Sequence, residues 1–197
     1  GGFLGDLQGN WEEQVTHGVG NSYGLEALIQ KKFGRTSGWI GYTLSWSNRQ
    51  FDDLNSGEWF PFTYDRRHDA SLVVTHQINE AWSGSVAWVY GTGRAVTLTE
   101  SLFNGLSFGN YPSAPVWEVP SDRNDYRMSS YHRLDVSFTR VKPGSDGNRA
   151  LIFSAYNAYN NLNPFFALAD QEADGSRLIR EYGLFPIIPS IAWRFHF

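Results

Sequence analysis

The sequence closes with Ser190-Ile191-Ala192-Trp193-Arg194-Phe195-His196-Phe197, a stretch in which apolar and polar residues alternate. In a β-strand every second side chain points to the same face, so Ile191, Trp193, Phe195 and Phe197 would form one apolar, mostly aromatic face. Strands of outer-membrane β-barrels have this pattern, because their outer face meets lipid and their inner face is polar. The stretch predicts such a strand, with Trp193, Phe195 and Phe197 as its C-terminal signal. An edge strand of a soluble sandwich is the alternative.

The composition is compatible with a barrel and excludes several other classes. Aromatic residues make up 16% of the 197 residues, and the mean hydropathy is only −0.39. A barrel can have such a value, because only every second strand residue meets lipid. No apolar run is long enough for a transmembrane helix. The 0 Cys exclude disulfides and thiol chemistry, and the net charge of −4 gives no basic surface for nucleic acid.

Strand-like stretches of roughly ten residues recur along the chain, and their connections alternate between short and long. About eight such strands are expected, at 22–33, 38–51, 67–78, 82–91, 130–141, 149–160, 178–184 and 190–197. The long connections are 52–66, 92–129 and 161–177. This asymmetry predicts an all-β fold, an antiparallel transmembrane β-barrel segment with short periplasmic turns and long extracellular loops.

Several local sequences carry a more specific signal, and they span most of the chain. They are Tyr23-Gly24-Leu25-Glu26, Gly38-Trp39-Ile40-Gly41-Tyr42-Thr43-Leu44-Ser45, Trp59-Phe60-Pro61, Tyr64-Asp65-Arg66-Arg67-His68-Asp69, Trp88-Val89-Tyr90-Gly91-Thr92-Gly93, Tyr131-His132-Arg133-Leu134-Asp135, Tyr156-Asn157-Ala158-Tyr159-Asn160, Asn163-Pro164-Phe165-Phe166 and Phe185-Pro186-Ile187-Ile188-Pro189-Ser190. Together and in this order they resemble the C-terminal portion of TonB-dependent outer-membrane receptors, especially the Bacteroidetes-type ones.

That resemblance implies a location in the bacterial outer membrane and a role in active nutrient uptake energised by the TonB system. The family's fold is a plug domain inside a barrel of about 22 strands, so residues 1–197 would correspond to the C-terminal part of the barrel, without the plug and the N-terminal barrel strands. The implied partners are outer-membrane lipid, the remainder of the receptor barrel and plug, and the TonB complex through the parent chain. A surface lipoprotein is a further candidate partner, and no cofactor is implied.

Charged residues are expected to be structural rather than catalytic. The cluster Asp65, Arg66, Arg67 and Asp69 lies at the predicted entry of a strand, where adjacent side chains point to opposite faces and cannot converge on one substrate. It is predicted to form ion pairs at the outer rim. Arg133 and Asp135 share a face and are predicted to form ion pairs in the lumen with neighbouring strands.

No catalytic motif or metal-ligand spacing stands out, and the 5 His are far apart in the sequence, so a non-enzyme is expected. Aromatic residues in the long connections are candidates for ligand contact, or they pack loops together. They are Trp59, Phe60, Tyr64, Phe108, Tyr111, Trp117 and Tyr126, of which Trp59, Tyr64, Trp117 and Tyr126 are the leading candidates.

Two other functions are compatible with the sequence. A small barrel of about eight strands can close by itself and serve a structural or adhesive role. A soluble β-sandwich that binds carbohydrate is the third possibility, and it differs from the others because its outward faces would meet water.

Overall fold

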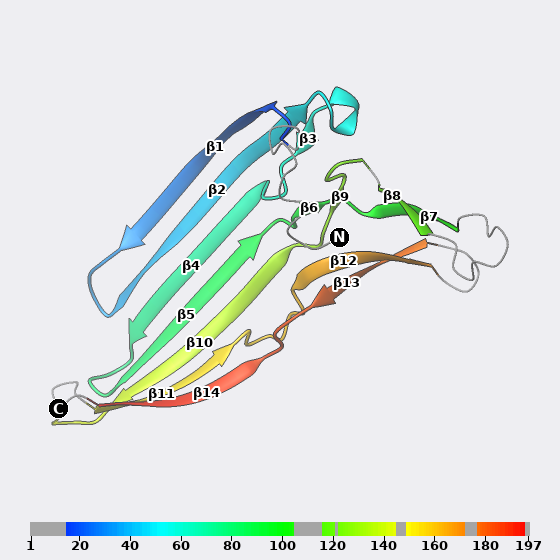
Figure 1. Ribbon diagram of the computed structural model, residues 1–197. Coiled ribbons are helices and arrows are strands. Elements are labelled where there is room, and N and C mark those ends of the chain that lie inside the picture. The colour runs from blue at the N-terminus through cyan, green and yellow to red at the C-terminus, as the bar shows by residue number, and fades with distance from the viewer. Residues whose placement is uncertain (1–14, 105–115, 121, 145–148, 172–176, 196–197) are drawn as a thin grey trace, which may run out of the picture.

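A computed structural model describes residues 15–104, 116–120, 122–144, 149–171 and 177–195. Within these residues the regular structure consists of β-strands and one short 3-10 turn, η3 (Asn55–Gly57). All strand pairs are antiparallel, and they form one large sheet and three two-stranded ribbons (Figure 1). The predicted all-β antiparallel fold is therefore confirmed.

The large sheet is an antiparallel meander, in which the main strands lie side by side in the order in which they occur along the chain. Its strands are β1 (Gly18–Lys31), β2 (Thr36–Phe51), β4 (His68–Gln77), β5 (Trp82–Gly91), β10 (Tyr131–Val141), β11 (Arg149–Tyr156) and β14 (Ile188–Phe195). The short β3 (Phe60–Pro61) pairs with β2 as an eighth strand. Within the described residues the sheet is open, with β1 and β14 at its two ends.

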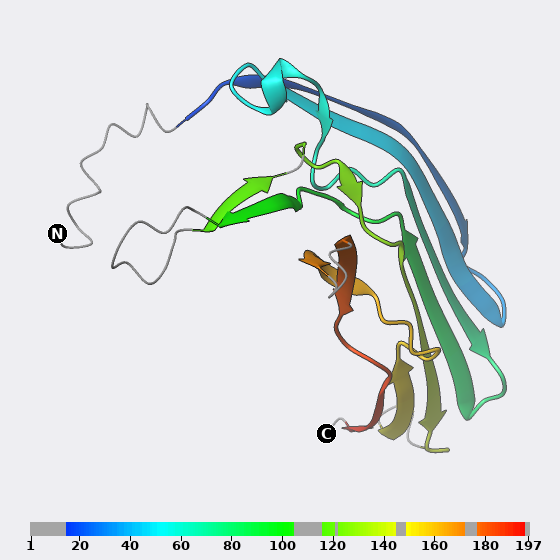
Figure 2. The same cartoon turned by 90° about the vertical axis from the view of Figure 1, so that its right-hand side faces the viewer.

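The three ribbons come from the long connections of the sheet. They are β6 (Ala95–Val96) with β9 (Tyr126–Arg127), β7 (Thr99–Asn104) with β8 (Val116–Pro120), and β12 (Pro164–Gln171) with β13 (Arg177–Gly183). Figure 2 shows the large sheet as a curved wall, with the β7–β8 and β12–β13 ribbons on its hollow side. The long connections thus cluster at one end of the wall, and the short turns lie at the other.

The strand predicted at 178–184 is present as β13 (Arg177–Gly183), but its predicted place in the wall is wrong. β13 pairs with β12, whereas β14 pairs directly with β11. Residues 186–189 are therefore not a turn between two neighbouring strands of the wall. Leu178 and Ile179 are consecutive and both exposed, so this stretch lacks the alternation of a two-faced wall strand. The sixth predicted strand also ends earlier, at Tyr156.

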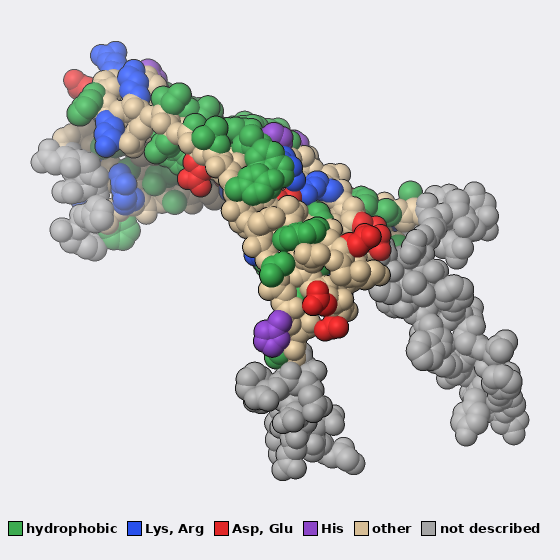
Figure 3. Space-filling view, turned by 90° about the horizontal axis from the view of Figure 1, so that it is seen from above, with side chains coloured by type: hydrophobic (Ala, Val, Ile, Leu, Met, Phe, Trp, Pro, Cys, Tyr) green, Lys and Arg blue, Asp and Glu red, His purple; other side chains and the backbone are tan. Residues whose placement is uncertain are grey.

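The registers of the strand pairs sort the side chains onto two different faces, because directly opposed residues share a face. One cross-strand row contains Ile29, Ile40, Leu72, Trp88 and Leu134. The same apolar face carries Tyr42, Val74, Val86, Val136, Phe138, Phe153, Ile191 and Trp193. Figure 3 shows hydrophobic side chains along the outer side of the wall, away from the ribbons.

The opposite face is mainly polar. It carries Ser22, Ser45, Thr43, Ser71, Thr75, Ser85, Asp135, Ser137 and Ser154. Two shallow cavities of about 370 and 250 Å³ lie over these residues, as expected for the hollow side of a curved sheet. Few apolar side chains are buried: among the described residues they are Phe60, Ala95, Met128 and Ala150. The wall therefore has a large apolar face and no conventional core behind it.

Candidate functional site

The end of the wall that carries the long connections is held together by contacts between segments distant in sequence. Arg94 Nη2 donates to the Phe165 carbonyl oxygen at 2.6 Å, which ties the segment after β5 to β12. Glu181 of β13 accepts hydrogen bonds from the Tyr126 hydroxyl at 3.0 Å and from the Ser129 backbone N–H at 2.8 Å. The β6–β9 region and the β12–β13 ribbon are thus fixed to each other, and they form one candidate recognition surface.

Asp65 is the buried centre of this network. It is 1% exposed, and its carboxylate accepts a hydrogen bond from the Ser47 backbone N–H at 2.7 Å. Arg127 Nη2 lies 2.6 Å from Asp65 Oδ2, and Arg67 Nη2 lies 3.6 Å from the same oxygen. Arg127 Nη1 also donates to the Gly93 carbonyl oxygen at 3.0 Å. The Asp65 carboxylate therefore joins β2, the entry of β4 and β9, and Arg127 extends these contacts to the segment after β5.

The other pair of the predicted rim cluster is more exposed. Arg66 Nη1 lies 3.3 Å from Asp69 Oδ2, and both side chains are nearly half exposed. Arg66 also extends over Gly91, where an added Cβ would approach its guanidinium. The cluster thus separates into two pairs, Asp65 with Arg67 and Arg66 with Asp69, and the first pair gains Arg127, which the sequence does not single out.

Arg133 is the centre of a polar cluster on the hollow face. Its guanidinium lies 4.2 Å from the centroid of the Tyr156 ring, and Nη1 donates to the hydroxyls of Tyr131 at 2.9 Å and Tyr156 at 2.8 Å. Arg133 Nη2 pairs with Asp135 Oδ2 at 3.0 Å on the same strand. The cross-strand partner of Arg133 is therefore the tyrosine of β11 rather than a carboxylate, which differs from the expected ion pairs between strands.

Asn157 directly follows β11 and is fully buried, with a φ of 52° in the left-handed region. Its Nδ2 donates to the carbonyl oxygens of Asn161 at 2.8 Å and Phe185 at 3.0 Å, and its Oδ1 accepts from the Asn161 backbone N–H at 3.0 Å. Its own backbone N–H donates to Asp135 Oδ1 at 2.9 Å. Asparagine tolerates this backbone conformation better than most residues. This structural centre was not predicted from the sequence, and the four asparagines between residues 157 and 163 are the signal that could have revealed it.

The aromatic candidates lie in different surroundings. Trp59 and Tyr64 are 48% and 70% exposed, and the Tyr64 ring packs edge-on against Phe62. Phe60 is buried and stacks on Phe51, so it packs the loop and is not available to a ligand. Trp117 lies in β8, opposite Phe103. Phe108 and Tyr111 lie outside the described residues.

Tyr126 is engaged within the chain. Burial, followed by the hydrogen bond and the negative charge of Glu181, raises the pKa of the Tyr126 hydroxyl above its usual value. A hydroxyl that already donates to Glu181 is an anchor for β13. Contact between a ligand and Trp59, Tyr64, Trp117 or Tyr126 remains a prediction.

The terminal aromatic residues lie on the apolar face at an edge of the wall. Ile191 and Trp193 are both 72% exposed, and Trp193 packs edge-on against Phe195 at 6.2 Å between ring centroids. Phe197 lies outside the described residues. In the described part of β14, the alternation predicted from the sequence is present.

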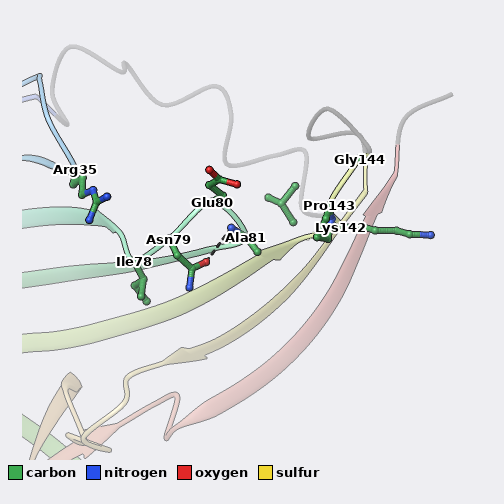
Figure 4. Close-up of a pocket in the computed structure, with 9 residues that line it drawn as sticks. Arg35, Ile78, Asn79, Glu80, Ala81, Lys142, Pro143 and Gly144 are labelled. Atoms are coloured by element: carbon green, nitrogen blue, oxygen red, sulfur yellow. Dashed lines mark hydrogen bonds between the residues drawn. The ribbon is translucent and has the colours of Figure 1, made fainter.

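At the opposite end of the wall, a cavity of about 780 Å³ opens between the short turns (Figure 4). Arg35, Glu80 and Lys142 come from the three turns around it. Asn79 Oδ1 shapes its turn by accepting the backbone N–H groups of Ala81 at 3.0 Å and Trp82 at 2.9 Å. The mixture of cations and a carboxylate gives this cavity no strong preference for one charge.

Two further properties concern metal ions and membrane-spanning helices. Among the described residues, no group of three or more His, Asp or Glu side chains could hold a metal ion. The same residues contain no helix with the length and apolar character needed to cross a bilayer. No family model, curated protein or solved structure matches this chain.

Proposed function

We propose that this chain forms part of the wall of a transmembrane β-barrel in a bacterial outer membrane, and that it is the C-terminal barrel region of a TonB-dependent receptor for nutrient uptake. The observation that carries the membrane proposal is the continuous apolar face. Ile29, Ile40, Phe138, Ile191 and Trp193 are between 47% and 72% exposed. Monomeric soluble proteins rarely expose apolar surface this extensive.

The backbone of the wall also suits a bilayer. Interior strands have hydrogen-bonded neighbours on both sides, so their polar backbone groups are satisfied without water, as lipid requires. The strands β4, β5 and β10 have 10, 10 and 11 residues. At about 3.4 Å per residue, tilted strands of this length can cross an apolar band of about 25 Å.

The two faces and two ends of the wall support the same orientation. The polar hollow face, with Arg133 and Asp135, would face the lumen, and the apolar face would meet lipid. The short turns would lie on the periplasmic side and the tied ribbons on the extracellular side. A soluble sandwich would need a second sheet about 10 Å from the apolar face, and the described residues place none there.

The open edges of the wall point to its partners. β1 and β14 each present one unpaired edge within the described residues, and such edges invite pairing with further strands. In the proposed receptor, those strands belong to the rest of the barrel, which also surrounds the plug. The assignment to TonB-dependent receptors, with coupling to the TonB complex and a surface lipoprotein as a candidate partner, rests on the sequence resemblance.

The proposal is tested on the natural polypeptide that carries this sequence. We expect it to remain in the outer-membrane fraction after a urea wash, to require detergent for extraction, and to have an intact mass several times 22.3 kDa. A mass near 22.3 kDa with membrane retention would favour the small stand-alone barrel. A polypeptide that is soluble and monodisperse without detergent would overturn the membrane proposal altogether.

A further inference from the structure

A groove lies on the outer side of the wall, at the end with the short turns. Its volume is about 440 Å³, and its main lining residues are Arg140, Lys142, Pro143, Arg149, Leu151 and Trp193. Three cationic side chains therefore border an apolar surface formed by the side chain of Leu151 and the indole of Trp193. This combination suits a ligand with an anionic head and an apolar tail.

The groove lies where the apolar face ends. One cross-strand row runs through Trp82, Arg140, Leu151 and Trp193, so an arginine lies between tryptophans on the lipid-facing side. The Arg140 guanidinium lies 5.7 Å from the centroid of the Trp82 ring. Tryptophan is enriched where the hydrocarbon meets the headgroups, and arginine reaches from that depth towards the polar layer. The row therefore marks the level of the headgroups.

Charge is distributed unevenly along the wall. At the turn end, the described residues include the cations Lys31, Lys32, Arg35, Arg140, Lys142, Arg149 and Arg194, and Glu80 is the only carboxylate among the described residues of the turns and adjoining strand ends. Glu80 borders the cavity between the turns (Figure 4) and does not line the outer groove. Neither Arg140 nor Arg149 forms an ion pair within the described part of the chain.

We propose that this outer groove binds an anionic phospholipid of the leaflet next to the short turns. Its phosphate would lie between the Arg140 and Arg149 guanidinium groups, and an acyl chain would lie on Leu151 and Trp193. Charge complementarity selects the headgroup, and the adjoining apolar face places the site at the edge of the hydrocarbon. This inference rests on the proposed function, because it requires the apolar face to lie against lipid.

The test uses the natural polypeptide in lipid nanodiscs of phosphatidylcholine with a minor fraction of phosphatidylglycerol, and native mass spectrometry after release counts the lipids retained. We expect preferential retention of phosphatidylglycerol, weakened at least about five-fold in the Arg140→Gln/Arg149→Gln variant. The Arg140→Lys/Arg149→Lys variant keeps both charges and should retain most of the preference. The matched control, Lys31→Gln/Lys32→Gln, removes the same charge from the same end but outside the groove, and should change little.

The outcomes separate the two proposals. A polypeptide that does not enter nanodiscs refutes the membrane proposal and this one with it. A polypeptide that enters nanodiscs but retains phosphatidylcholine and phosphatidylglycerol equally refutes only the lipid site. Equal losses in the groove variant and the lysine control would also overturn it, because they would indicate diffuse attraction to the whole turn end.

Discussion

Arg127 and Asp65 are 62 residues apart in the sequence, yet Arg127 Nη2 lies 2.6 Å from Asp65 Oδ2. The arginine comes from the short strand β9, within the longest connection of the wall, and the carboxylate precedes β4. Their contact fixes this connection over the end of the sheet. Any recognition surface that the loops form therefore depends on the buried carboxylate of Asp65, whose partners come from three segments.

Asp65→Asn keeps the shape of the side chain and removes its charge. We expect the free energy of unfolding to fall by about 2–3 kcal/mol, since charge-assisted hydrogen bonds to Arg127 and Ser47 are weakened. Urea unfolding in detergent micelles, followed by tryptophan fluorescence, measures the change. The control Asp69→Asn alters the exposed pair with Arg66 and should cost at most about 1 kcal/mol. Equal losses in both variants would contradict the central role of Asp65.

Two substitutions of Asn157 separate the contribution of its side-chain hydrogen bonds from that of its backbone conformation. Asn157→Gly removes the side-chain hydrogen bonds to Asn161 and Phe185 but tolerates the φ of 52°, and it should cost about 2–3 kcal/mol. Asn157→Ala loses the same bonds and strains the backbone, so it should cost at least about 1 kcal/mol more. The order of the two urea midpoints decides the matter: a glycine variant less stable than the alanine variant would exclude the backbone contribution.

The sequence predicted the wall well, and physical reasons explain where it failed. Alternation such as Ile40, Tyr42, Leu44 and Trp46 is imposed by a sheet with two different faces, so it is visible in one strand alone. The strand at 178–184 was assigned to the wall because the sequence does not show which strand it pairs with. It pairs with β12, and neither of these two strands has the two-faced pattern of a wall strand. Asn157 and Asn160 hold Phe185 and Ile187 instead, which brings β14 beside β11.

Only part of the polar network could be predicted, because contacts between distant segments leave no local pattern in the sequence. The sequence indicated ion pairs within 65–69, because those residues are neighbours along the chain. Arg127 and Glu181 gain their roles only when the long connections fold back, and no local pattern distinguishes them from other charged loop residues. The cross-strand row of Trp82, Arg140, Leu151 and Trp193 likewise exists only after four strands are in register.

Substitution of Gly93 tests the close approach between the segment before β6 and the segment after β9. A Cβ at this position would overlap the backbone carbonyl group of Met128, so Gly93→Ala should force the two segments apart and cost about 1–3 kcal/mol. Gly41→Ala is the matched control within the wall, since its Cβ would meet Trp39 at 3.5 Å and Ser71 at 3.6 Å, which are ordinary contacts. Protease cleavage between residues 92 and 130 should increase only in the Gly93 variant. Unchanged cleavage would show that the contact is not required.

We expect the anchoring of β13 by Tyr126 to be lost at high pH. Burial and Glu181 raise the pKa of its hydroxyl in the folded protein. The protonated form is therefore favoured by folding, and the contribution is complete below the ordinary tyrosine pKa of about 10. It disappears as the pH rises through the higher pKa of the folded state. Stability measured from pH 8 to pH 11 should fall less steeply in Tyr126→Phe than in the parent; identical slopes would contradict the prediction.

The apolar face gives the sharpest test of membrane embedding, because neighbouring residues of one strand differ only in the face to which they point. Leu72 lies in the middle of the row from Ile29 to Leu134, and Val73 lies on the hollow face and lines its smaller cavity. Near the middle of a bilayer, Leu72→Arg should reduce the free energy of unfolding by about 2–4 kcal/mol, because the guanidinium would enter hydrocarbon. Val73→Arg places the same group towards the polar lumen and should cost much less. Folding titrations into lipid vesicles measure both variants under the same conditions. If the two substitutions cost the same, or if Leu72→Arg costs nothing, the apolar face does not meet lipid, and the membrane proposal fails at its central observation.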